Sequence, residues 1–405
     1  MALPMFDWVS GFHAARAADK KVGGHTFILV WLSGGPATID MWDLKPGSKN
    51  GGEFKPIATT GSGQICEHMP TIAKQMKHLS IIRSYTSRDG SHERGTYINH
   101  TAFAPVASVT HPAIGAVMAK FNTPGNLEIP GHISLGGPGV SPGFLGAAYA
   151  PFRVEAGDNP IPNIAAAVDR RRFERRIGLL ETMQDSFVKQ GRGELPKEHH
   201  TIYDRSLNLM SSKLLESFKI DKVSAAQREK YGDHQFGRNC LLATRLVEIG
   251  VPFVEIGLGG WDMHQEVFDN LATGRNAKLP QLDQGLGSLV EDLAASGLLS
   301  KTTICCMGDF GRTPKINQDA GRDHWPTGWS VVVGGAGIKG GEVIGKMDDD
   351  GVEIVDHPVD VSNLFATLYH AVGISEATEL RSPNGRPLKL VGTFGNGEPV
   401  KELLA

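Results

Sequence analysis

The sequence predicts an α/β protein: a mostly parallel central sheet between layers of helices, with a helical insertion. Residues 25–32 and 302–307 are short runs that are apolar on both faces, which is typical of buried strands in a parallel sheet. Residues 279–299 have helical periodicity and connect the strand-like run at 251–258 to the run at 302–307, completing a strand–helix–strand unit. Residues 163–250 are charged, largely glycine-poor and helically periodic, which predicts the insertion.

The length of 405 residues would accommodate two or three average domains, although large α/β folds often use that length for one sheet with insertions. We expect one α/β domain over residues 25–390, interrupted by the helical insertion at about 163–250. Residues 1–24 are expected to form a separate N-terminal segment, and residues 391–405 a tail.

The N-terminal segment contains one feature of an export signal. Residues 14–19 resemble its small-residue end, but the charged and long apolar parts that should precede that end are missing. A truncated signal and an ordinary amphipathic N-terminus both fit. We therefore expect export to the periplasm or the medium if the native start carries a signal, and a cytoplasmic location otherwise.

Charge and composition exclude several classes of protein. The formal net charge of −3 and the lack of a long Lys/Arg block imply no general attraction to nucleic acid. No apolar run approaches the roughly 20 residues that cross a bilayer. The four cysteines have no CxxC spacing, so neither a zinc knuckle nor a disulfide framework is supported. The sequence predicts no oligomeric state.

Acidic and imidazole side chains follow the predicted strands at their carboxyl ends. Asp262 and His264 leave one strand, Asp309 leaves the next, and Asp323 and His324 lie in the glycine-flanked loop behind it. Loops that leave parallel strands converge at one edge of the sheet. Oxygen and nitrogen ligands of this kind suit a divalent cation such as zinc, manganese or calcium.

Two further places along the chain contain candidate residues with open alternatives. Asp40 follows the first strand and is a candidate metal ligand, whereas Asp43 more simply caps a turn. Ser91 and His92 stand where a helix begins, a position that favours an anion. Ser91 could instead serve only as the N-cap of that helix. His92 gains nothing from the helix dipole there, which favours a functional role for its imidazole.

Five motifs in the same order resemble a bacterial sulfatase-like family of uncharacterised function, usually exported and grouped with the alkaline phosphatase superfamily. The motifs span most of the chain: LSGGPATIDMWD (32–43), GGWDMH (259–264), MGDFGRTP (307–314), GRDHWP (321–326) and GIKGG (337–341). The resemblance implies the superfamily fold and a metal centre that cleaves phosphate or sulfate esters. It also implies that Asp262 and His264 form a ligand pair, and that Asp309 and His324 are further ligands.

This sequence departs from the family pattern at three points. The first strand ends in Ser33 rather than in an acid, so the ligand role at that strand moves to Asp40. Phe310 stands where better-known members of the superfamily have a histidine or asparagine, so a complete second metal site is not implied. No Cys-x-Pro-x-Arg motif is present, which excludes the formylglycine nucleophile of typical sulfatases.

The resulting hypothesis is a metal-dependent hydrolase that acts on phosphate or sulfate esters of a small molecule or saccharide. In this hypothesis His92 protonates the leaving oxygen, and Ser91, or Thr86 in its place, is the nucleophile. Arg312 either clamps the equatorial oxygens of the substrate or ties two loops together. The alternative is a protein that keeps the fold and binds an anionic ligand or polysaccharide without turnover.

Overall fold

A computed structural model describes residues 24–405, except residues 158–160, 162–163, 191–194, 275, 376 and 393. The predicted N-terminal segment therefore lies outside the described residues, apart from Gly24. Among the residues that the structure describes, no helix combines the length and the apolar character that a bilayer crossing requires.

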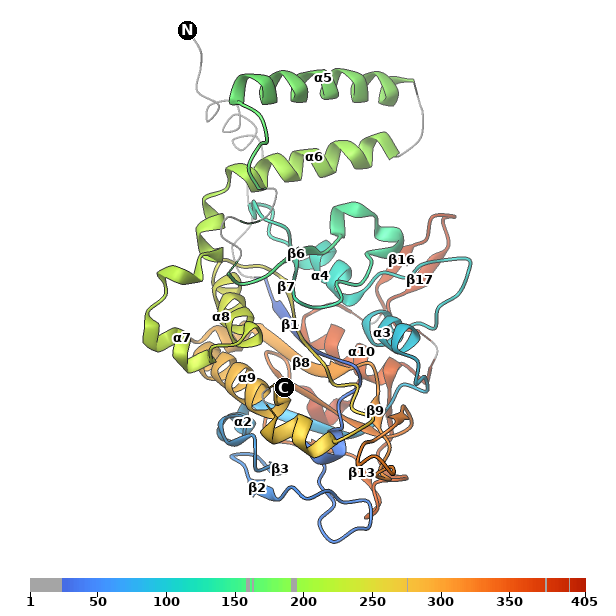
Figure 1. Ribbon diagram of the computed structural model, residues 1–405. Helices are drawn as coiled ribbons and strands as arrows, with labels where there is room; N and C mark the ends of the chain where they lie inside the picture. The colour runs from blue at the N-terminus through green and yellow to red at the C-terminus, as the bar shows by residue number, and fades with distance from the viewer. Residues whose placement is uncertain are drawn as a thin grey trace.

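A nine-stranded sheet forms the centre of the described chain (Figure 1). Its strands are β1 (Thr26–Ser33), β4 (Leu79–Thr86), β5 (His132–Leu135), β6 (Phe152–Val154), β7 (Phe253–Gly259), β8 (Thr302–Gly308), β11 (Trp329–Gly335), β12 (Val343–Ile344) and β15 (Val359–Asp360). The spatial order is β12-β4-β11-β8-β1-β7-β5-β6, and β15 also pairs with β4. Strand β11 is antiparallel to its neighbours β4 and β8, and the other pairings are parallel.

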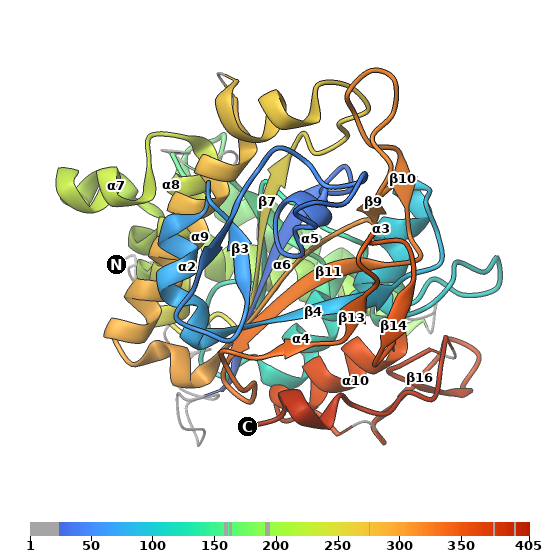
Figure 2. The same ribbon diagram turned by 90° about the horizontal axis from the view of Figure 1, so that it is seen from below.

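Helices cover both faces of this sheet, as Figure 2 shows in the view from below. One face carries α2 (Pro70–Gln75), α8 (Gln235–Glu248) and α9 (Lys278–Ala295), and the other carries α3 (His92–Thr101), α4 (Ile114–Asn122) and α10 (Val361–Ala371). Alternate residues of β1 point to the two faces: Ile28 and Val30 join the first core, and Phe27 and Leu29 the second. The predicted mostly parallel sheet between helix layers is thus confirmed.

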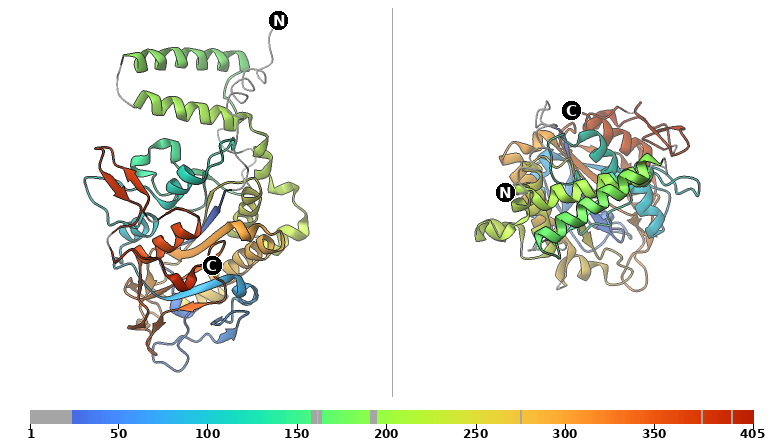
Figure 3. Two further views of the ribbon diagram at one scale, coloured as in Figure 1. Left: turned by 180° about the vertical axis from the view of Figure 1, so that it is seen from behind. Right: turned by 90° about the horizontal axis from the view of Figure 1, so that it is seen from above.

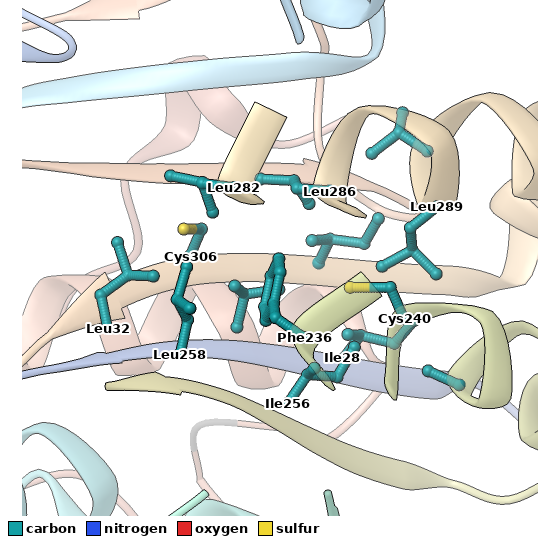
Figure 4. Packing of buried hydrophobic residues seen from close by; sticks show 14 of the residues in the cluster. Ile28, Leu32, Phe236, Cys240, Ile256, Leu258, Leu282, Leu286, Leu289 and Cys306 are labelled. Carbon is teal, nitrogen blue, oxygen red and sulfur yellow. The ribbon is translucent and has the colours of Figure 1, made fainter. Parts of the chain in front are cut away.

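Apolar side chains of α8 and α9 pack directly on the central strands (Figure 4). The residues shown in close contact are Phe236 and Cys240 of α8, Leu282, Leu286 and Leu289 of α9, and Ile28, Leu32, Ile256, Leu258 and Cys306 of the sheet. Burying one such side chain contributes about 1.5–3 kcal/mol. This layer holds β1, β7 and β8 in place, and these three strands deliver the polar residues described below.

Residues between β6 and β7 are mainly helical. They contain α5 (Arg170–Lys189), α6 (Leu195–Ser211), η5 (Lys213–Phe218), η6 (Ile220–Lys222), α7 (Ala225–Tyr231) and then α8. Helices α5 and α6 contact each other and stand off from the sheet, as the left view in Figure 3 shows. Helix α8 instead packs against α9 and β7, so it belongs to the layer that covers the sheet.

Four small two-stranded sheets and several short helical turns complete the described chain. The small sheets pair β2 (Pro56–Ala58) with β3 (Gln64–Cys66), β9 (Gly311–Arg312) with β10 (His324–Trp325), β13 (Lys346–Met347) with β14 (Ile354–Asp356), and β16 (Glu379–Arg381) with β17 (Pro387–Lys389). The turns are η1 (Thr38–Asp40), η2 (Met76–His78), η3 (Gly143–Leu145), η4 (Ala147–Tyr149), η7 (Asp269–Thr273), η8 (Leu298–Lys301) and η9 (Lys401–Leu403).

Candidate metal centre

The carboxyl ends of β1, β7 and β8 lie side by side. In the parallel register Ser33 is opposite Gly259, and Leu32 is opposite Gly308. The three strands therefore end at nearly the same level, and the loops that follow them meet at one edge of the sheet. These loops carry Asp262 and Asp309, which the sequence predicts at this edge.

Three imidazoles converge on the carboxylate of Asp262. Its Oδ1 lies 3.1 Å from Nε2 of His264 and 3.2 Å from Nε2 of His324. Its Oδ2 lies 3.5 Å from Nε2 of His92. The Nε2 atoms of His264 and His324 are themselves only 3.1 Å apart. We call Asp262, His264, His324 and His92 the histidine cluster.

Each ring of the histidine cluster is oriented by an acceptor on its far side. Nδ1 of His264 lies 2.7 Å from Oδ1 of Asp323, and Nδ1 of His92 lies 2.7 Å from Oδ2 of Asp309. Nδ1 of His324 lies 2.7 Å from the carbonyl oxygen of Gly90. A neutral ring that donates from Nδ1 carries its lone pair on Nε2.

The residues of the cluster fit a bound divalent cation. Nε2 of His264 and Nε2 of His324 lie 3.1 Å apart, and both lie beside Oδ1 of Asp262, so three atoms of the kind that bind a cation face one another. Metal-binding histidines typically donate their other N–H to a carboxylate or a carbonyl, as both of these do. Among the described residues, His92, Asp262 and His324 also offer ligand atoms that lie within 4.8 Å of one another.

The electrostatics of the cluster keep its carboxylates ionised. Partial burial acts to raise the pKa of Asp262, but hydrogen bonds from Arg312 and His324 outweigh it and lower the pKa to about 2. The hydrogen bond from His264 likewise lowers the pKa of Asp323. Both acids therefore carry negative charge at neutral pH, as ligation or orientation of a ligand requires.

Asp309 is placed behind His92 rather than beside the Nε2 atoms. It is buried, and its carboxylate oxygens accept from the backbone N–H of Gly34 at 3.1 and 3.3 Å and face Nδ1 of His92. Its own carbonyl accepts from Nδ2 of Asn99 at 2.8 Å. This carboxylate thus orients the imidazole of His92 and joins the ends of β1 and β8.

Arg312 is fully buried and all of its N–H groups are used within the protein. A guanidinium has five such donors. They reach the carbonyl oxygens of Gly34, Gly35 and Arg322, Oδ1 of Asp262, and Nε2 of His264 at 3.3 Å. Of the two roles that the sequence leaves open for Arg312, these contacts favour tying loops together over clamping a substrate.

Asp40 is not brought to the histidine cluster. Both of its carboxylate oxygens accept from Arg322, Oδ2 from Nε and Oδ1 from Nη2, each at 2.7 Å. The pair is buried, and Arg322 also donates to the carbonyl oxygens of Asn50, Thr313 and Pro314. Asp40 thus holds the loop around residue 322 in place through an ion pair, a contact that competes with metal ligation.

Ser91 occupies the N-cap position of α3, yet its side chain accepts no hydrogen bond from the first turn of that helix. The first backbone N–H groups of a helix have no intrahelical partners, and the helix dipole adds partial positive charge there. Because α3 begins at His92, this end of the helix lies at the cluster. It offers a place for an anion next to the three imidazoles.

Phe310 is buried among the imidazoles of the cluster. Its ring centroid lies 4.3 Å from that of His324 and 4.9 Å from that of His92. The aromatic ring fixes these two imidazoles by packing. Phe310 therefore places an apolar ring, and no metal-binding atom, beside His92 and His324.

The sequence indicated Asp323 as a candidate beside His324 but not its contact, which is with His264, far away in the sequence. Sequence reasoning missed one further group that orients the cluster. The carbonyl of Gly90 has no sequence signal, because any residue carries one. The glycine is no hint either, since a Cβ there would make only ordinary contacts of 3.5 Å or more with His324 and Pro326.

The fold and the cluster define an α/β protein with a histidine and carboxylate centre at the carboxyl edge of its sheet. The chain belongs to a family described as "Protein of unknown function (DUF1501)", which matches residues 25–404. No curated protein matches the sequence.

Several solved structures resemble the fold at low identity. A sulfatase (PsFucS1) from Pseudoalteromonas sp. is 12% identical with a TM-score of 0.41, over 92% of this chain and 72% of that chain. A protein in the alkaline phosphatase superfamily from Vibrio parahaemolyticus is 11% identical with a TM-score of 0.40, over 92% of this chain and 76% of that chain. The lipoteichoic acid synthase LtaP from Listeria monocytogenes is 9% identical with a TM-score of 0.40, over 91% of this chain and 79% of that chain.

Proposed function

We propose that this protein is a metal-dependent hydrolase of phosphate or sulfate esters, the chemistry that its motifs imply. The observation that carries the proposal is the convergence of three imidazole Nε2 atoms on the carboxylate of Asp262, each imidazole oriented from behind by an acceptor. Isolated histidines on a protein surface need no such orientation. Three of them around one acid, each with a fixed ring, are typical of a site that holds a ligand.

The proposal divides the cluster into two parts. Asp262, His264 and His324 would hold the cation, which is zinc, manganese or calcium. When bound, such a cation supplies Lewis-acid chemistry by polarising a phosphoryl or sulfuryl oxygen. His92 has its Nδ1 bonded to the buried Asp309 and its own side chain is 40% exposed, so its Nε2 can give a proton to, or take one from, a bound ester.

The anion of the ester is proposed to bind at the first turn of α3. Backbone N–H groups there are not capped by a side chain, and they adjoin His92. The hydroxyl of Ser91 lies at the same helix end and is the proposed nucleophile, with Thr86 as its substitute. Because Oγ1 of Thr86 lies 3.2 Å from the carbonyl oxygen of Pro326, to which it can donate, Ser91 is the better candidate.

Two matched variants separate the parts of this proposal. We expect His324→Gln to lower the stoichiometry of bound metal, measured by elemental analysis after dialysis against zinc, manganese or calcium. We expect His92→Gln to keep the metal but to lower kcat for 4-nitrophenyl phosphate or 4-nitrophenyl sulfate by about 10²–10⁴, the usual contribution of a proton-transfer group. Retention of metal and full activity by both variants would contradict the proposal.

A non-catalytic binding protein is the second candidate, and one observation favours it. The guanidinium of Arg312 already places a positive charge against Asp262 and His264, so the cluster has an internal cation. Such a site could bind an anionic ligand or a polysaccharide without turnover. Elemental analysis that finds no stoichiometric metal, together with no ester hydrolysis on adding each cation, would select this candidate.

A further inference from the structure

A cavity of about 620 Å³ opens beside the histidine cluster, between the end of β1, helix α3 and the loop that follows β5. His92 and Asp309 form the end nearest the cluster, and the remaining walls include Ser33, Glu93, Tyr97 and Val140. A volume of this size accommodates one sugar or aryl ring with space to spare, since drug-sized ligands occupy pockets of roughly 300–1,000 Å³.

The chemistry of this cavity differs from that of the cluster. Among the described residues that line it there is no lysine or arginine, and two of them, Glu93 and Asp309, are acids. Beyond the first turn of α3, Glu93 and Asp309 disfavour a further anionic group, whereas Tyr97 and Val140 offer apolar surface to an uncharged group. The Tyr97 ring is held by its hydroxyl, which accepts from the backbone N–H of His111 at 2.8 Å.

A buried histidine–glutamate pair lies behind two walls of the cavity. Nε2 of His100 lies 2.9 Å from Oε1 of Glu255, and both side chains are at most 2% exposed. Nδ1 of His100 lies 2.7 Å from the carbonyl oxygen of Thr96, which can only accept. Nδ1 must therefore donate to Thr96, and Glu255 accepts from Oγ of Ser134 and from the backbone N–H of Gly139 as well, so four contacts hold the pair.

The contacts of this pair end on the cavity walls. Thr96, whose carbonyl faces His100, lines the cavity from α3. Gly139, whose N–H donates to Oε2 of Glu255 at 2.9 Å, precedes Val140 in the opposite wall. The space around Glu255 is filled, since a Cβ on Gly137 would lie 2.5 Å from its carboxyl carbon. The two walls are therefore joined through one buried carboxylate on β7.

We infer that this cavity receives the uncharged, ring-bearing part of the ester, and that the His100–Glu255 pair is a positioning pair that holds the two walls at a fixed spacing. The first half of this inference rests on the proposed hydrolase, because it assigns the anion to the cluster and the alcohol to the cavity. The second half concerns the shape of the cavity and can be tested without turnover.

Binding of 4-nitrophenol and of methyl β-glucoside to protein without added metal, measured by saturation-transfer NMR, tests the cavity. We expect at least one ring to bind, and Tyr97→Ala to weaken that binding about tenfold or more. Arg94→Ala, an exposed change on the same helix, should leave it unaltered. No binding of either ring, or equal binding by the wild type and Tyr97→Ala, overturns the assignment. Ring binding without any ester hydrolysis would instead refute the proposed function alone.

The positioning pair is tested with substitutions that match either nitrogen of His100. His100→Asn can reach only Thr96, whereas His100→Gln can reach only Glu255. We expect His100→Asn to bind the ring severalfold more weakly than the wild type does. We expect His100→Gln to bind it nearly as tightly as the wild type. Tyr231→Phe, which removes a buried hydroxyl on the other face of the sheet, should leave ring binding unchanged.

Equal ring binding by the wild type, His100→Asn and His100→Gln would overturn the positioning role. A loss of binding in the Tyr231→Phe control, equal to that in His100→Asn, would also overturn it, because it would indicate a general loss of packing. If His100→Asn does not fold, Ser134→Ala removes one donor to Glu255 with a smaller disturbance and should weaken binding in the same direction. Unchanged binding in Ser134→Ala would then count against the pair.

Discussion

Asp323→Asn is the substitution whose effect on the proposed metal centre can be worked out most directly. Oδ1 of Asp323 lies 2.7 Å from Nδ1 of His264, and an asparagine oxygen can accept the same hydrogen bond without the charge. A charge-assisted hydrogen bond is about twice as strong as a neutral one, which contributes about 1 kcal/mol. Loss of an outer carboxylate partner typically lowers metal affinity by about 10–100-fold. Because the Asp323 side chain is 56% exposed, solvent screening places the expected loss near tenfold.

Calorimetric titration of zinc into metal-free protein measures this difference. Asp319→Asn is the matched control, since it removes the same charge from the same loop and Asp319 is exposed. We expect tighter zinc binding by Asp319→Asn than by Asp323→Asn, and wild-type affinity in the control. Equal affinities for all three proteins would refute the reasoning that the carboxylate behind His264 strengthens this ligand.

Three further predictions concern stability and activity. Arg322→Met leaves the buried carboxylate of Asp40 without its partner and should cost about 3–5 kcal/mol in denaturant unfolding, part of which Asp40→Leu in the same chain should restore. Burial lowers the pKa of His132 from 6.5 to about 4, so the unfolded chain takes up this proton at a higher pH than the folded protein does. The free energy of unfolding should therefore fall by up to about 3 kcal/mol as the pH drops from about 6.5 to about 4. Denaturant unfolding of His132→Asn over the same pH range should show a smaller fall. Gly95→Ala would place a Cβ 2.7 Å from the carbonyl oxygen of Asp309, so it should displace α3. Expressed as free energies, the loss of kcat/KM for an aryl ester should exceed the loss in the free energy of unfolding.

Much of the architecture could be predicted from local patterns. The runs at residues 25–32 and 302–307 are apolar on both faces because both faces of β1 and β8 are covered by helices. Strand ends in a parallel sheet lie together, so Asp262 and Asp309 could be placed at one edge before any coordinates were known. For these two acids, their position directly after a predicted strand was enough to place them at this edge of the sheet.

The details of the cluster depend on packing that no local pattern encodes. Asp309 and Asp262 look alike in the sequence, yet Asp309 is buried against Gly34 and His92 while Asp262 faces the open site. Arg312 lies in the short strand β9 and Arg322 in a loop, and arginine is usually exposed, but both are buried by carbonyl groups and acids from other segments. Such pairings arise only when the loops meet.

The residues of the cluster come from distant parts of the chain, and this affects the stability of the protein in the cell. His92 follows β4, Asp262 follows β7 and His324 lies in β10, so the unfolded polypeptide has no preformed cage for an ion. A cation bound there would stabilise only the folded protein. The gain in the free energy of unfolding is RT ln(1 + [L]/Kd), where [L] is the free metal concentration and Kd the dissociation constant, or about 2.7 kcal/mol when [L] is a hundred times Kd. Supply of metal would then govern how long each molecule survives proteolysis as well as how fast it works.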